Sequence, residues 1–222
     1  MTPKLGVLGL LTMIVSSIFE PRERPPATLH VPRATTELVL DGELEEPSWS
    51  AGAARTGIFV APNGEPGRPH SEARFVWRGD TLYVALYAAD RDIRASHAPA
   101  DGPRWLDGDA FELTFSGEDG RVHITRIEIS PDGTVTDAQR TTRGTWDYAW
   151  QSGARVGHDT DGTVNEPRDE DEEWVLEVAV PLSAIGVAAE AGARSVYDLR
   201  RCDWAPSGPR TCTSSTGVLE LE

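Results

Sequence analysis

Beyond its first 19 residues this chain has no methionine and no lysine, because Met1, Met13 and Lys4 all lie near the N-terminus. Haem domains of related folds commonly use axial ligand pairs that include a methionine, and these pairs are therefore missing from the rest of this chain. The histidines lie far apart, without His-x-x-His or His-Glu-x-x-His spacing, so no transition-metal centre is expected. Phosphate-binding glycine loops and the Gly-x-Ser-x-Gly motif are absent too. We expect no haem, no nucleotide and no catalytic motif.

Positive charge is scarce. The chain has 21 basic and 36 acidic residues, for a formal net charge of −15. Binding of nucleic-acid phosphates requires clustered lysine and arginine, so nucleic acid is excluded as a partner. Neutral sugars and cations remain compatible with this surface.

Long hydrophobic runs are also rare, and the clearest one extends from Leu5 to Phe19 behind Lys4. This arrangement is typical of a secretory signal peptide and is short for a bilayer span. We therefore predict a signal peptide or N-terminal anchor over residues 1–19, no other membrane association, and export to the periplasm or the extracellular space. Residues 20–36, rich in proline and charge, are expected to form a linker.

Cysteine occurs only at Cys202 and Cys212. An even pair in an exported chain predicts a disulfide. Closing a loop of this length stabilises a domain by about 2–3 kcal/mol in the chain-entropy model. A metal or redox pair is the weaker alternative, because Cys-x-x-Cys spacing is missing.

What the remaining sequence does contain is a series of short period-two segments separated by Gly, Pro, Asp and Asn. Alternating runs cover residues 74–78, 82–87, 111–115, 121–130, 173–180, 194–201 and 217–221, and residues 182–185 indicate one helical turn. This spacing predicts an all-β fold, an antiparallel β-sandwich of immunoglobulin-like or jelly-roll type, in one domain over residues 37–222. Trp49, Trp77 and Trp174 are expected in its core.

Four segments occur in a fixed order: LDGELEEPSW (40–49), DTLYVALYAADRD (80–92), WLDGDAFELTF (105–115) and DEEWVLEVAVPLSAIG (171–186). Together they resemble the family 9 carbohydrate-binding modules, β-sandwich accessories of secreted polysaccharide-degrading enzymes. The resemblance implies that the first segment forms a strand and a turn with Trp49 packed beneath the sandwich. It also implies an oligo- or polysaccharide partner, xylan-type catabolism and a separate glycoside hydrolase as a possible associate.

The same resemblance points to a sugar site. Trp105 lies in a turn-rich stretch where an exposed indole can stack on a pyranose. Glu112 alternates with core residues, and Arg126 and Glu128 share one face of the next strand, so the three can meet on a sheet surface. Trp204 is the candidate for a second aromatic platform, with Trp146 and Trp150 as rivals. The alternative is that Glu112 and Arg126 form a plain surface ion pair.

Acidic clusters suggest a structural calcium ion, which some members of the family bind. Calcium takes six to eight oxygens, and the loops around Asp90, Asp92, Asp107 and Asp109 offer carboxylates. The alternative is a solvated acidic surface, because no EF-hand loop is present.

The sequence therefore predicts an exported, non-catalytic carbohydrate-binding module that recognises a plant or microbial glycan. Two alternatives remain open: a glycoside hydrolase or associated subunit acting on xylan-type glycans, and a sandwich that has lost sugar binding. Paired carboxylates do not separate these hypotheses, because a chain this acidic always contains some pair at hydrolase spacing.

Overall fold

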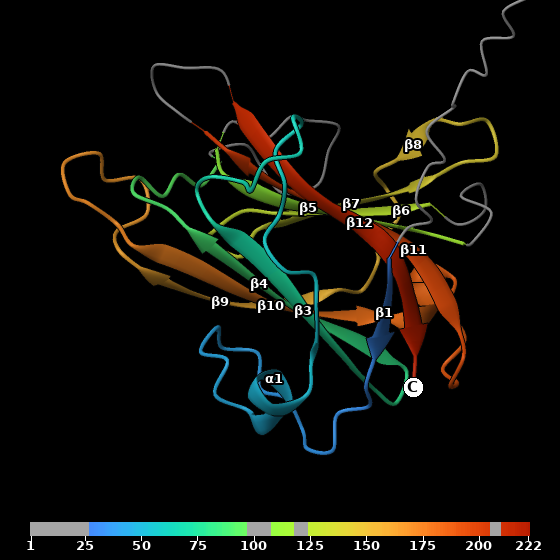
Figure 1. The fold of residues 1–222 in the computed structure, drawn as a ribbon. Helices are drawn as coiled ribbons and strands as arrows, with labels where there is room; N and C mark the ends of the chain where they lie inside the picture. Colours follow the sequence, from blue (N-terminus) through green and yellow to red (C-terminus); the bar gives the residue numbers. More distant parts are fainter. Residues whose placement is uncertain (1–26, 97–107, 118–123, 205–209) are drawn as a thin grey trace, which may run out of the picture.

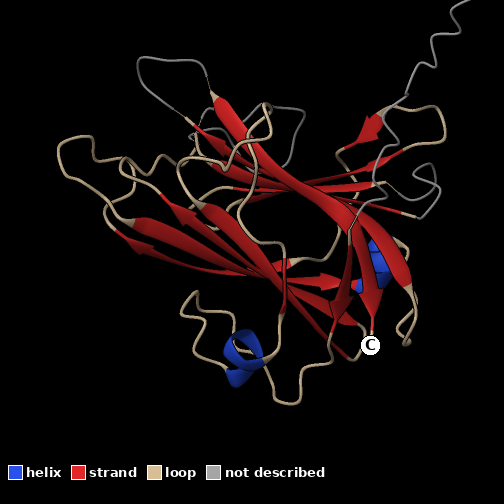
Figure 2. Ribbon diagram, in the orientation of Figure 1, coloured by secondary structure: helices blue, strands red, loops and turns tan. Residues whose placement is uncertain are grey.

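A computed structural model describes residues 27–96, 108–117, 124–204 and 210–222. In this part of the chain two β-sheets face each other, as Figures 1 and 2 show. The larger sheet has the order β1 (Thr28–Val31), β12 (Thr211–Leu221), β11 (Arg194–Asp203), β5 (Ala110–Ser116), β6 (Thr125–Ile129), β7 (Val135–Arg140) and β8 (Trp146–Asp147). The smaller has the order β2 (Ala54–Arg55), β3 (Ser71–Arg78), β4 (Thr81–Ala89), β10 (Glu173–Pro181) and β9 (Arg155–Asp161). The expected all-β sandwich is confirmed.

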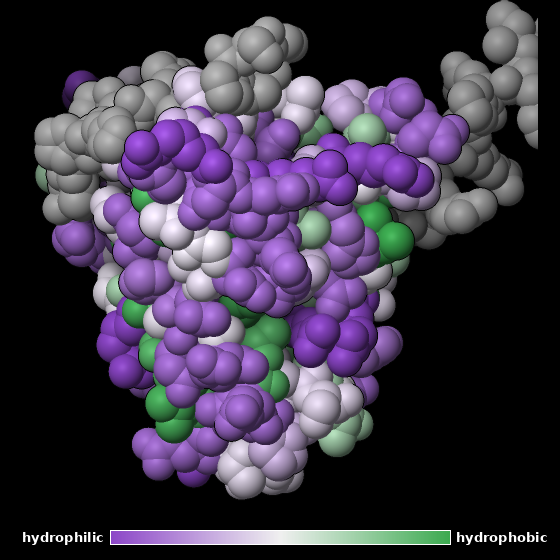
Figure 3. Space-filling view, turned by 90° about the vertical axis from the view of Figure 1, so that its left-hand side faces the viewer, coloured by the Kyte–Doolittle hydropathy of each residue, from purple (hydrophilic) through white to green (hydrophobic). Residues whose placement is uncertain are grey.

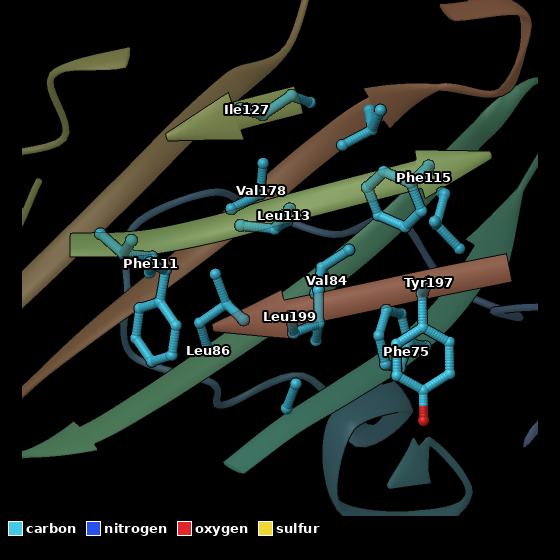
Figure 4. Packing of buried hydrophobic residues seen from close by; sticks show 14 of the residues in the cluster. Phe75, Val84, Leu86, Phe111, Leu113, Phe115, Ile127, Val178, Tyr197 and Leu199 are labelled. Atoms are coloured by element: carbon cyan, nitrogen blue, oxygen red, sulfur yellow. The ribbon is translucent and has the colours of Figure 1, made fainter. Parts of the chain in front are cut away.

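The core lies between the two sheets and is built from the inward residues of their central strands (Figure 4). Phe111, Leu113 and Phe115 of β5 meet Val84 and other residues of the smaller sheet there. Because side chains alternate across a pleated strand, each apolar set points inward and the residues between point outward. The outward faces are therefore where polar function can be placed.

All three tryptophans expected in the core are fully buried. Trp77 and Trp174 belong to the cluster between the sheets, whereas Trp49 packs with Val76 and Ala85 on the outer side of the smaller sheet. Trp49 lies on helix α1 (Pro47–Ala51), which covers that outer side in Figure 1. The predicted helical turn is confirmed as the 3-10 helix η1 (Leu182–Ile185).

Two sequence expectations about the N-terminal part are wrong. Residues 28–31 were assigned to a linker, but they form β1, which pairs in parallel with β12. The segment 40–49 was expected to include a strand, but it forms a turn followed by α1, with Pro47 at the helix start. Proline suits the first helical turn because its missing N–H has no partner there anyway.

The turn at residues 41–42 is held by Glu177, an outward residue of β10. Its carboxylate accepts the backbone N–H groups of Asp41 and Gly42 at 2.9 and 2.8 Å and the indole N–H of Trp49 at 2.7 Å. Burial raises the pKa of Glu177, while these three donated hydrogen bonds act in the opposite direction. The first and last of the four sequence segments therefore meet at one buried carboxylate.

Cys202 and Cys212 are directly opposite each other in the β11–β12 hairpin and form the predicted disulfide. Neither helix in the described part of the chain has the length and apolar character that crossing a membrane requires.

Candidate functional site

The outward face of the larger sheet brings three of the predicted sugar-binding residues together. Glu112 on β5 is directly opposite Glu128 on β6. Arg126, two residues before Glu128 on β6, is opposite Thr114 on β5. Two core-facing residues, Leu113 and Ile127, are paired between them, so strand alternation directs the polar residues outward. The adjacency expected from the sequence is confirmed.

Arg126 lies between the two glutamates. Its Nε is 3.7 Å from Oε2 of Glu112, and its Nη1 is 3.6 Å from Oε1 of Glu128. These distances are within ion-pair range but too long for direct hydrogen bonds. The side chain of Arg126 is only 19% exposed, so the pair is half-buried rather than a freely solvated surface contact.

An aromatic ring covers this group. The guanidinium carbon of Arg126 lies 4.5 Å from the ring centroid of Trp146, at the start of β8. A stacked guanidinium and indole form a cation–π contact, and the indole supplies an apolar surface beside hydrogen-bonding groups. Of the two rivals to Trp204, Trp146 is therefore the one that contacts the predicted polar set.

Trp204 lies just beyond the end of β11, the strand that pairs with β5. Residue 200 of β11 is opposite Glu112, so Trp204 is displaced from Glu112 by four residues, or about 13 Å at the usual rise of a strand. Its indole is half-buried and stacks against the guanidinium of Arg94 at 5.4 Å. A ligand touching both Glu112 and Trp204 would have to span that distance. Trp105 lies outside the described residues, so its role stays a prediction.

Two arginines that the sequence analysis did not single out join the site. Arg200 is the cross-strand partner of Glu112, with 3.9 Å between its Nη1 and Oε1 of the glutamate. Arg210, just before β12, lies in the electrostatic field of Glu128 and Glu112. Burial lowers the pKa of Arg210, while the two glutamates act against that effect. Strand alternation within residues 194–201 indicates which way Arg200 points, but not which strand lies beside it.

Beside the backbone of Trp204, at the end of β11, lies a largely buried acidic cluster. Asp90, Asp109 and Asp203 have carboxylate oxygens within 4.8 Å of one another. Arg201, which points into the core, bonds to Asp90 at 2.5 Å and to Asp203 at 2.7 Å. Burial, followed by the charge of Asp90, raises the pKa of Asp109 to about 7. Burial also raises the pKa of Asp203.

The described residues of the suggested calcium site already have other partners in this structure. Calcium requires six or more free oxygens, whereas the guanidinium of Arg201 already lies among the carboxylates where a cation would bind. Both carboxylate oxygens of Asp109 accept backbone N–H groups. The carboxylate of Asp92 instead accepts two hydrogen bonds from the guanidinium of Arg94. Asp107 lies outside the described residues. Calcium binding stays an untested prediction.

A cleft of about 1090 Å³ opens at the same end of the molecule. It is lined by residues 66–70, 89–91 and 170–172 together with Ile58. Figure 3 views the molecule from the side of Figure 1 where these loops lie, and its surface is largely hydrophilic with small hydrophobic areas between. The predicted sugar-binding residues Glu112, Arg126 and Glu128 lie on the outward sheet face instead, whereas Asp90 of the acidic cluster forms part of the cleft wall.

The outward sheet face therefore combines half-buried charged groups with a flanking indole. No protein-family model matches the sequence, and no curated protein is significantly similar to it in sequence. Solved structures do match. A protein from Bacteroides uniformis that has been proposed to bind carbohydrate has a TM-score of 0.66 and 17% identity, covering 89% of this chain and 100% of that one.

Two structures of a family 9 carbohydrate-binding module from Caldicellulosiruptor kristjanssonii match as well. The complex with cellotriose has a TM-score of 0.60 and 12% identity, over 88% of this chain and 94% of that one. The complex with glucose has a TM-score of 0.59 and 13% identity, over 88% and 96%. The chain therefore has the fold of a family 9 carbohydrate-binding module, as its sequence segments indicated.

Proposed function

We propose that this protein is a non-catalytic carbohydrate-binding module and that Glu112, Arg126 and Glu128, flanked by Trp146, form its sugar site. One observation carries the proposal: two carboxylates and a guanidinium from paired strands converge on the outward sheet face under an indole. Carboxylates accept and guanidinium groups donate the directional hydrogen bonds that sugar hydroxyls make, and the indole matches the C–H face of a pyranose. The sugars held by the matching Caldicellulosiruptor structures support this ligand class.

The proposal extends to location and to biological role. The charged and hydrophobic N-terminal segment supports export, and the fold supports an accessory part in polysaccharide catabolism, with a separate glycoside hydrolase as associate. Fractionation of the native host and detection of the protein outside the cytoplasm test the first point. Incubation with xylan tests the second, because a binding module releases no reducing sugar and a hydrolase does.

Titration of the purified protein with cello- and xylo-oligosaccharides, followed by tryptophan fluorescence, tests sugar binding itself. A saturable and sugar-specific change is expected. Glu112→Gln and Trp146→Ala should each weaken binding about five- to 150-fold, since charged hydrogen bonds and stacking contribute about 1–3 kcal/mol each. Trp150→Ala is the matched control, because Trp150 follows in the same segment and has no contact with Arg126 among the described interactions.

A flat response to every sugar, with a cooperative thermal unfolding transition, would show that the sandwich serves as a scaffold. Loss of binding in Trp150→Ala but not in Trp146→Ala would place the site elsewhere on the sheet.

A further inference from the structure

The charge balance of the candidate site differs from that of the whole protein. Acidic residues outnumber basic ones 36 to 21 overall. Around Glu112 the outward positions of β5, β6, β7 and β11 carry no such acidic excess. Among the described residues these positions have three arginines (Arg126, Arg140, Arg200) and three acidic residues (Glu112, Glu128, Asp198). Farther along the same face Arg194 and Glu220 pair with each other and add no net charge.

Arg126 has unused hydrogen-bonding capacity. Its Nε is buried, and among the described residues this nitrogen has no hydrogen-bond partner. The nearest carboxylate oxygen, on Glu112, is 3.7 Å away and too distant for a hydrogen bond. A buried donor without a partner is costly, so a shift of the side chain that brings this nitrogen to an acceptor from outside the protein would be favourable.

Arg200 can bind a ligand for a different reason than Arg126: its guanidinium is accessible and only loosely paired. Its side chain is 52% exposed and its contact with Glu112 is loose, at 3.9 Å. An exposed ion pair of this kind contributes little to stability, so the guanidinium can turn to another anion at small cost. Arg200 and Arg126 approach Glu112 from the two strands that flank β5. Their guanidinium groups therefore face the same small area of the sheet surface.

We infer from the two guanidinium groups beside Glu112, those of Arg126 and Arg200, that the site prefers a sugar bearing a carboxylate, a uronic acid unit, over the corresponding neutral sugar. The inference rests on the proposed sugar-binding function. A guanidinium binds a carboxylate through two parallel hydrogen bonds, which a neutral hydroxymethyl group cannot reproduce. In this arrangement Arg126 and Arg200 hold the sugar carboxylate, Glu112 and Glu128 accept its hydroxyls, and Trp146 stacks on the ring.

The test compares pairs of ligands that differ only at this group. Methyl β-D-glucuronide and methyl β-D-glucoside, and the matching galacturonide and galactoside, are titrated into the purified full chain by calorimetry. In at least one pair the uronide should bind about tenfold or more tightly than the neutral glycoside, as for charge-assisted hydrogen bonds elsewhere. The ratio should shrink between 20 and about 500 mM salt because free ions screen the interaction.

Equal affinities, or tighter binding of the neutral partner in both pairs, would overturn the uronic acid preference while leaving the sugar-binding function intact. Binding of none of the glycosides or oligosaccharides would overturn both. Arg200→Gln should reduce the uronide-to-glycoside affinity ratio, and Arg126→Lys, which keeps the charge but not the planar fork, should reduce it too. Arg155→Gln removes an exposed arginine on β9 of the other sheet and should leave the ratio unchanged. A ratio unaffected by both site variants contradicts the inference.

Discussion

The backbone N–H of Trp204 donates a hydrogen bond of 2.7 Å to Oδ1 of Asp109, and the other oxygen of the same carboxylate accepts the backbone N–H of Arg94 at 2.7 Å. Asp109 thereby joins the two residues whose side chains stack on each other. Asp92 orients the guanidinium of Arg94 through bonds of 2.8 and 3.1 Å. One face of the Trp204 indole is covered by Arg94, so a sugar that uses this ring has to stack on the other face.

For an oligosaccharide long enough to reach both Glu112 and Trp204, Arg94→Ala is therefore expected to weaken binding about two- to fivefold, the range of a cation–π contact at a partly exposed site, because the indole loses its support. In a Trp204→Ala background the same change should have no further effect, since Arg94 acts through Trp204. Calorimetric affinities of the single and double variants give the answer. Arg74→Ala is the matched control, because Arg74 forms a similar fork with Glu72 on the smaller sheet. Additive losses would show that Arg94 contacts the sugar directly or acts elsewhere.

The disulfide closes the hairpin that carries Trp204 and Arg210. Replacing Cys202 and Cys212 together by alanine removes a link across ten residues and should lower the free energy of unfolding by about 2–3 kcal/mol. The affinity for an oligosaccharide that reaches Trp204 should fall as well, because Asp203 and Thr211 then hold the ends of the hairpin by strand pairing alone. Urea unfolding and calorimetry measure the two effects. Unchanged affinity with reduced stability would separate the hairpin end from the sugar site.

The sequence predicted those features that depend on contacts close in the chain. Alternation identified the strands now seen as β3, β4, β5 and β10, because one face of each is apolar. The meeting of Glu112 with Arg126 and Glu128 followed from two outward faces on consecutive paired strands. Local pairing of this kind needs no knowledge of the rest of the fold.

What the sequence could not show depends on distant partners. Strand β9 is polar along much of its length, so it carries no alternation signal, and it forms only because β10 offers a free edge. Arg201 occupies an inward position where alternation predicts an apolar residue, and it is tolerated because Asp90, 111 positions away, compensates its charge. A buried charge is stable only with such a partner. The partner is identified by the three-dimensional fold alone.

Gly42 is required by the close crossing of its turn over β9. Its φ angle is +92°, and a Cβ there would lie 2.4 Å from the backbone nitrogen of Asp159. Gly42→Ala is expected to cost about 3 kcal/mol or more of unfolding free energy, from the strained backbone and the clash together. Gly52→Ala is the control, because a Cβ at Gly52 meets nothing within 4 Å and its φ of −167° is accessible to any residue. Urea unfolding of both variants should show a loss only for Gly42→Ala, and similar midpoints would mean that the turn can move away from β9.

Asp109 should also make the stability of the protein fall as the pH rises from about 4 to 7. Burial, then the charge of Asp90, raises the pKa of this carboxyl to about 7, although Arg201 and the two backbone hydrogen bonds oppose the shift. In the unfolded chain its pKa is about 3.9, so between these values the unfolded state has released a proton that the folded state retains. The contribution of Asp109 is therefore fully present below about pH 4 and is lost once the pH exceeds about 7. Asp203, whose pKa burial also raises, acts in the same direction.

The measurement is the urea midpoint from pH 4.5 to 8 for the parent and for Asp109→Asn, whose side chain does not titrate. The variant should show a flatter profile over this interval. Asp169→Asn removes an exposed carboxylate outside the cluster and controls for the general repulsion of a chain with net charge −15. If Asp109→Asn and Asp169→Asn give the same slope, the pH dependence comes from the acidic surface. A slope that disappears only in Asp109→Asn would show that the pH dependence comes from Asp109, the buried carboxyl that accepts the backbone N–H of Trp204.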